Sequence, residues 1–76
     1  MVVYLEDSNG EQKATWPTTT ISLAQLKEAF EGATGALFLK SNNLAIIRDA
    51  SDNYHLQDVE TYVVKVPAKG TFISAS

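Results

Sequence analysis

The stretch AFEGATGALFLK (residues 29–40) passes from a helical to a strand pattern within a dozen residues. Its last part, Ala36–Lys40, is a short apolar run of the kind that forms strands. Between the two patterns, residues 32–35 (Gly-Ala-Thr-Gly) offer only small side chains, and glycine tolerates the left-handed backbone that follows many helices. The stretch therefore predicts a helix that stops at Gly32 or Gly35 and folds back directly into a strand.

The helix itself is predicted just upstream, over Leu23–Phe30. Apolar residues recur there at spacings of three and four, which is typical of one buried helix face. They are Leu23, Leu26 and Phe30. Ser22 followed by Gln25 fits a capping box at the start of the helix, and Ile21 and Leu26 are spaced for a hydrophobic staple across that cap.

Two hairpins and a final strand flank the helix. Asp7–Gly10 is a turn cluster that ends in Asn-Gly, the strongest short hairpin signal. Pro17 ends the strand that follows, because proline cannot donate to a strand ladder. Ser41–Asn43 and Ser51–Asn53 are further breaks. The predicted strands are Val2–Leu5, Gln12–Trp16, Ala36–Lys40, Leu44–Arg48 and Thr61–Val66.

This order of elements is that of the α+β class called the β-grasp, or ubiquitin-like, fold, in which a mixed sheet of about five strands packs on one helix. The long apolar run of the last strand suits the centre of the sheet, beside the first strand. Residues 1–69 are predicted to form this domain, and residues 70–76 the start of a linker or tail. The predicted core is Val3, Leu5, Ile21, Leu26, Phe30, Phe38, Val63 and part of the Ile46–Ile47 pair.

Composition and charge exclude several classes of protein. The net charge of −3 argues against nucleic-acid binding by this domain, because that affinity comes mainly from cations that meet phosphates. The chain has no cysteine, which excludes a disulfide framework, a thiolate zinc site and a thiol nucleophile. No apolar run approaches the ~20 residues of a membrane span, and the N-terminus lacks the pattern of a signal peptide. We therefore expect an intracellular domain without membrane contact.

No set of residues suggests catalysis. His55 is the single histidine and lies in a polar segment, where solvation is the more common role. The pairs Glu6 and Asp7, or Glu28 and Glu31, are ordinary enough to be solvated surface. Phosphate-binding glycine motifs and metal-ligand spacings are absent from the sequence. We expect no enzymatic activity, no cofactor and no metal ion, and a function based on contact with other proteins.

Two of the predicted strands lie at the edges of the sheet, where unpaired backbone groups invite pairing with another chain. They are Glu11–Trp16 and Leu44–Arg48. Each carries a charged residue, Lys13 or Arg48, but is otherwise open. Docking of one edge on the other is a heterologous contact, which builds filaments unless the rotation closes a ring.

The segment Thr20–Gly35 resembles part of the N-terminal domain of the TAR DNA-binding protein family, animal splicing regulators. That domain carries the same F-x-G-A-x-G pattern at the end of its helix. Thr61–Gly70 is similar to the closing strand of the family, with its Y-V-V pattern followed by proline. Val3–Pro17 also matches in length. The resemblance covers almost the whole chain, with a shorter segment around Ser41–Asn53.

The chain is also similar to the DIX domains of Dishevelled and Axin. Residues 21–41, ISLAQLKEAFEGATGALFLKS, look like their I-T-L-x-D-F-K…G-A-x-Y-x-F-K-S stretch. Residues 46–53, IIRDASDN, look like their V-V-K-E-E-x-S-D-D stretch. Both families share the β-grasp fold and polymerise head to tail through sheet edges. The two resemblances imply one mechanism, self-association that clusters attached modules, in two different pathways.

The resemblances also imply where the two surfaces lie. The head surface falls on the second strand: Glu11, Gln12, Lys13, Thr15 and Trp16. The tail surface falls on the fourth: Leu44, Ile47 and Arg48. The splicing regulators have acidic residues where this chain has Gln12 and Thr15, and DIX domains have an aromatic residue at Gln12. Glu11 is therefore expected to supply the negative charge opposite Arg48.

The expected partners are further copies of this domain and other proteins of the same fold. Nucleic acid is expected only through other domains of a longer chain. The nucleus is the expected compartment if the splicing-regulator resemblance holds, and the cytoplasm if the chain is of DIX type. The alternative interpretation is that the protein is a monomeric ubiquitin-like adaptor that binds another protein through one face of its sheet.

Overall fold

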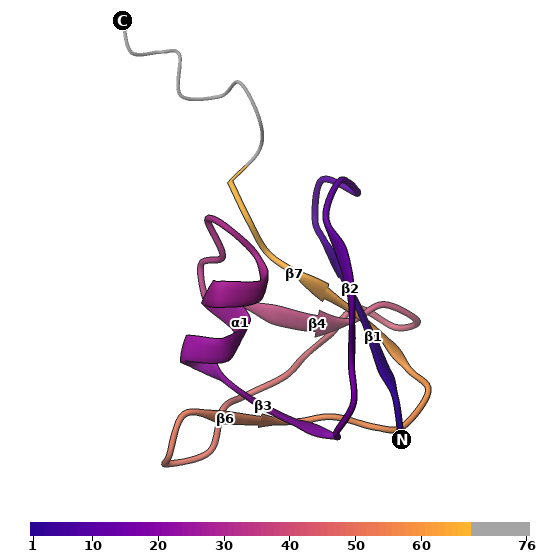
Figure 1. Cartoon of the computed structure of the whole chain (residues 1–76), viewed down its shortest axis with the longest axis vertical. Coiled ribbons are helices and arrows are strands. Elements are labelled where there is room, and N and C mark those ends of the chain that lie inside the picture. The colour runs from indigo at the N-terminus through magenta and orange to yellow at the C-terminus, as the bar shows by residue number, and fades with distance from the viewer. Residues whose placement is uncertain (68–76) are drawn as a thin grey trace, which may run out of the picture.

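The computed structural model describes residues 1–67 (Figure 1). The predicted linker, and the last two residues of the predicted domain, lie outside the described residues. Within these residues, one helix and seven strands follow one another. They are β1 (Val3–Asp7), β2 (Lys13–Trp16), β3 (Thr20–Ser22), α1 (Leu23–Ala29), β4 (Leu37–Leu39), β5 (Leu44–Ala45), β6 (Asn53–His55) and β7 (Thr61–Val64).

The main sheet has five strands in the order β2-β1-β7-β4-β5. β1 and β7 are parallel, and every other neighbouring pair is antiparallel. The first and last strands therefore lie side by side at the centre, as predicted, with α1 packed to one side of the sheet (Figure 1). Beyond the strands, the Ser8 hydroxyl donates to the Val66 carbonyl and accepts from the Val66 amide. The predicted α+β architecture, a β-grasp-like mixed sheet with one helix, is confirmed.

A second, two-stranded sheet of β3 and β6 was not predicted. Ile21 pairs with Tyr54 across it, and both side chains are fully buried. Ser51–Asn53, predicted as a break, leads directly into β6. This small sheet fixes the entry of the chain into α1, because Ser22 is at once the last residue of β3 and the cap of the helix.

The predicted helix start is confirmed, but its predicted end is wrong. The Ser22 hydroxyl accepts from the Gln25 amide at 3.1 Å, and the Gln25 side chain accepts from the Ser22 amide at 3.0 Å, which completes the capping box. The helix ends at Ala29, and Phe30 caps it in an extended conformation with its side chain fully buried. The helix therefore ends before Phe30, and not at a glycine. Gly32 and Gly35 take positive φ only in the connection that follows.

The core forms where α1 and the β3–β6 pair cover the inner face of the main sheet. Its buried side chains come from almost every element. They are Val3, Leu5, Ile21, Leu26, Phe30, Leu37, Tyr54, Leu56, Tyr62, Val64 and Val66. Five of the predicted core residues are in this set: Val3, Leu5, Ile21, Leu26 and Phe30.

The prediction of Phe38 and Val63 as core residues is wrong. They are half-buried neighbours across β4 and β7, while Leu37, Tyr62 and Val64 take the buried positions. Successive side chains of a strand point to opposite faces, so a shift of one residue exchanges the two faces. Phe38 and Val63 thus belong to the outer face of the sheet.

The fourth strand is shorter than the predicted Leu44–Arg48. The Ile46 amide still donates to the Leu37 carbonyl at 2.8 Å, after which the chain diverges from β4. Ile46 packs against the core, whereas Ile47 is 80% exposed. Arg48, which follows, donates to the Tyr54 hydroxyl.

Candidate functional site

The two predicted contact surfaces lie partly on the two outermost strands of the main sheet. Lys13, Thr15 and Trp16 are on β2 and Leu44 is on β5, whereas the other predicted residues lie in the adjoining segments: Glu11, Gln12, Ile47 and Arg48. β2 has β1 as its only neighbour strand, and β5 has only β4, in the part of the chain that the structure describes. The prediction that these strands are the sheet edges is therefore confirmed. The two edges face away from each other across the width of the sheet, so one copy can dock on a neighbour at each side.

The head surface divides into exposed and anchored residues. Glu11, Lys13 and Thr15 are exposed. Gln12 is half-buried, and its side-chain oxygen accepts from the Glu31 amide at 3.3 Å. Trp16 is also half-buried, packs against the core and donates from Nε1 to the Thr20 carbonyl at 2.8 Å. Gln12 and Trp16 thus have structural roles, which leaves the exposed residues to meet a partner.

Buried Asp7 holds the turn that presents the head surface. β1 extends to this residue, which the sequence placed in the turn. Its Oδ1 accepts from the amides of Asn9 and Glu11, and its Oδ2 accepts from the amide of Gln12. Burial by itself raises the pKa of the Asp7 carboxyl, but these backbone donors, together with the Gly10 amide, outweigh it and hold the pKa below the ordinary 3.8.

Asp7→Asn is expected to lower the thermal midpoint at neutral pH, because an amide has one acceptor oxygen where the carboxylate has two. A carboxyl with a depressed folded pKa stabilises the fold above its unfolded pKa, and this stabilisation is lost as the pH falls through the folded pKa. The gap in midpoint between wild type and Asp7→Asn should therefore be widest at neutral pH and narrow below pH 3.8. Thermal unfolding followed by circular dichroism at a series of pH values measures this gap. Asp58→Asn is the control, and a gap independent of pH contradicts the assigned role.

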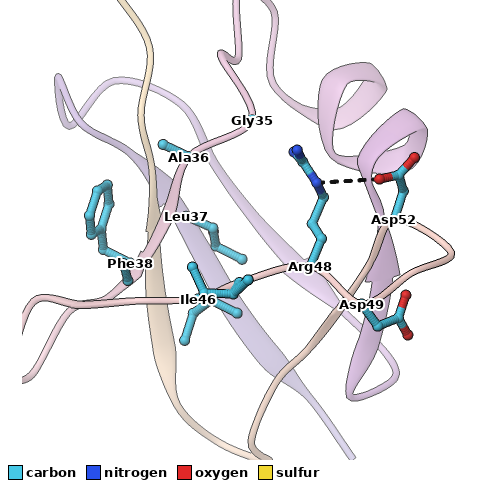
Figure 2. A pocket seen from close by; sticks show the side chains of 10 residues that line it. Gly35, Ala36, Leu37, Phe38, Ile46, Arg48, Asp49 and Asp52 are labelled. Atoms are coloured by element: carbon cyan, nitrogen blue, oxygen red, sulfur yellow. Dashed lines mark ion pairs between the residues drawn. The ribbon is translucent and has the colours of Figure 1, made fainter.

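The tail surface borders a groove of about 370 Å³, here called the tail groove. It opens where β4 and the segment after β5 diverge, and it is lined by residues 35–38, residues 45–49 and Asp52 (Figure 2). Of the predicted tail residues, Ile47 and Arg48 line the groove. Leu44 does not, although it is 56% exposed on the same strand edge.

Arg48 lies inside the tail groove and is bound by the fold itself. Its Nη1 donates to the Tyr54 hydroxyl at 3.2 Å, and the guanidinium lies 5.8 Å from the centre of the Tyr54 ring. The Tyr54 hydroxyl in turn donates to the Gly35 carbonyl. The Nε of Arg48 lies 3.5 Å from an Asp52 carboxylate oxygen (Figure 2). The sequence singled out Arg48 but gave no sign that Tyr54 and Gly35 hold it.

A second carboxylate, Asp49, organises the loop beside the groove. Its Oδ1 accepts from the amides of Ser51 and Asn53, and its Oδ2 lies 2.7 Å from Nε2 of His55. The hydrogen bond from His55, followed by these two backbone donors, holds the pKa of the Asp49 carboxyl below its ordinary value. The loop is thus fixed by local bonds, and His55 is an exposed partner of this carboxylate.

Within residues 1–67, no group of three or more His, Cys, Asp or Glu side chains is placed to hold a metal ion. No helix in this range is long and apolar enough to cross a membrane. Comparison of the chain with protein-family models, curated proteins and solved structures finds no match. The interpretation of the two edges therefore depends on the residues of this chain.

Proposed function

We propose that this protein is a self-associating domain that clusters whatever modules are attached to it. Each copy docks the head surface on β2 against the tail surface on β5 of the next copy. The observation that carries the proposal is that β2 and β5, which hold part of each surface, have one neighbour strand each among the described residues and lie at opposite ends of the sheet order. Strand addition at such an edge supplies main-chain hydrogen bonds and sets the register.

The exposure of the tail surface supports the same proposal. Leu44 on β5 and Ile47 in the segment that follows are large, exposed apolar side chains, at an edge where monomeric proteins more often carry charges or proline. A contact of this size is weak, with a dissociation constant of about 1–100 μM, because lost freedom of motion offsets much of the contact energy. Many weak contacts in one assembly add by avidity, so attached modules gain effective concentration while each junction remains reversible.

The resemblance to the splicing regulators and to DIX domains supports head-to-tail polymerisation as the mode of association. On the first resemblance, the attached modules are RNA-binding domains and the compartment is the nucleus. On the second, they are signalling domains and the compartment is the cytoplasm. The proposed contact between head and tail surfaces is the same in both cases, because it does not depend on which modules are attached.

One observation favours the adaptor as a second candidate. On the outer face of the sheet, a shallow hollow of about 540 Å³ has Tyr4, 42% exposed, in its lining. Glu6 and Lys40, 2.9 Å apart, also line this hollow, as do Lys13 and Thr15. An exposed aromatic ring with charged neighbours suits a single protein ligand on this face. This adaptor would remain monomeric at every concentration.

Sedimentation velocity over a concentration series separates the two candidates. The wild type should show a weight-average mass that rises with concentration. Thr15→Glu at the head and Ile47→Glu at the tail should each remain monomeric, because both residues are exposed and a buried charge at the junction is costly. A mixture of the two variants should give dimers and nothing larger, since one intact junction remains per pair.

Ala24→Glu is the matched control, because it adds the same charge at an exposed position of α1, away from both edges. It should associate like the wild type. A wild-type domain that stays monomeric at millimolar concentration contradicts self-association, and the adaptor then replaces it. Equal effects of all three glutamate variants would point to net charge and not to the edges.

A further inference from the structure

The tail groove contains one cation and two carboxylates, so it carries an excess of negative charge. Arg48 is the cation, and Asp49 and Asp52 are the carboxylates. The side chain of Arg48 is 37% exposed and already contacts both Tyr54 and Asp52. Asp49 accepts from two backbone amides and contacts His55. Asp49 is therefore well satisfied within the fold, and Arg48 has Asp52 as its carboxylate neighbour.

Asp52 is the more exposed of the two carboxylates in the groove. Its side chain is 67% exposed, and its ion pair with Arg48, at 3.5 Å, is longer than a strong charge-assisted hydrogen bond of about 2.7–2.9 Å. Its backbone, by contrast, is held at both sides: its amide donates to the Asp49 carbonyl at 3.0 Å, and its carbonyl accepts from the Leu23 amide at 2.9 Å. The carboxylate is thus an exposed part of the groove lining that is held by a fixed backbone.

On the head surface, Lys13 is the matching cation. It is exposed on β2, and the residue opposite it on β1 is Glu6. Glu6, however, lies 2.9 Å from Lys40 across the outer face. Within residues 1–67, Lys13 therefore forms no ion pair of its own. A lysine carries its charge on a flexible four-carbon stem, which suits it to reach a carboxylate across an edge contact.

We infer that Lys13 of one copy docks at the Asp52 carboxylate in the tail groove of the next copy. This inference rests on the proposed self-association and names the charge pair that orients it. The positive charge then lies on the head and the negative charge on the tail. The sequence predicted the opposite arrangement, with acidic Glu11 on the head and basic Arg48 on the tail. Arg48 instead stays with Tyr54 and shapes the groove.

Neutralising variants test the pair by a double-mutant cycle, with the dissociation constant measured by sedimentation equilibrium. Lys13→Gln and Asp52→Asn should each weaken association about two- to fivefold, as expected for a partly exposed pair. The double variant should be no weaker than either single variant, because the lost interaction is the same one. Asp52 has a φ of 63°, and asparagine accepts that conformation as readily as aspartate, so the backbone is retained.

Lys27→Gln and Glu28→Gln make the same charge changes at exposed positions of α1 and should leave association unchanged. If Arg48 were the docking point for an acidic head, Asp52→Asn would remove a competing carboxylate and tighten association. Tighter association by Asp52→Asn, or full additivity in the double variant, therefore overturns the inference while the proposed function stands. A wild type that never associates overturns both.

Discussion

Leu26→Ala is expected to lower the free energy of unfolding by about 2–5 kcal/mol, the usual cost of truncating a fully buried leucine. Leu26 is 0% exposed and is the single fully buried residue within the seven residues of α1. A domain of this size has a free energy of unfolding near the lower end of the usual range of about 5–15 kcal/mol. The substitution should therefore remove a large part of the total stability.

Urea unfolding followed by circular dichroism measures the loss. Leu44→Ala is the matched control, because the same side chain is removed from an exposed position on β5, and its cost should stay below about 0.5 kcal/mol. Equal effects of the two substitutions would mean that the apolar face of α1 does not anchor the sheet.

Gly35→Ala is expected to lower the free energy of unfolding by about 1–3 kcal/mol from backbone strain alone, because Gly35 has a φ of +101°. A Cβ atom there would also meet Nη1 of Arg48 at 3.0 Å and Cδ1 of Leu23 at 3.4 Å. The Arg48 guanidinium should thus shift by a few tenths of an ångström, which changes the shape of the tail groove. Weaker self-association is the second expected result.

Gly10→Ala separates the two contributions. Gly10 has a φ of +74°, but a Cβ there would meet no atom within 4 Å. Its cost should come from backbone strain alone, and the tail groove should be untouched. Urea unfolding gives the difference in stability, and sedimentation velocity gives the difference in association. Identical behaviour of the two variants would show that the contact between Gly35 and Arg48 has no consequence.

The fold could be predicted because independent local signals agree with one another. The capping box at Ser22, the Asn-Gly turn before β2 and the apolar spacing of the helix each fix one element, and their order leaves one common architecture. Which side chains of β4 and β7 face the core was harder to predict, because both strands are unbroken apolar runs without an alternation of polar and apolar residues. Lys40 and Lys65, two positions after Phe38 and Val63, mark the outer face and were the signal to use.

The small β3–β6 sheet was missed because its strands are three residues long and mostly polar. The alternation of Tyr54, His55, Leu56 and Gln57, with the apolar members buried, was a usable sign of a strand. The edges of the site could be predicted from the order of the strands. The partners of its charged residues could not be predicted. Arg48 donates to Tyr54, and Tyr54 donates to Gly35, but these three residues meet through the topology of the fold and not through their spacing in the sequence.

The central position of β1 and β7 has a consequence for synthesis of this protein. Ser8 and Val66, which exchange two hydrogen bonds, are 58 positions apart in the chain. On a ribosome, β1 must therefore wait until nearly all of residues 1–67 have left the exit tunnel before its parallel partner is available. Contacts between such distant residues form late and slow the folding of the chain. Under the proposed self-association, a nascent chain would therefore join its neighbours on the same messenger only after its sheet has closed.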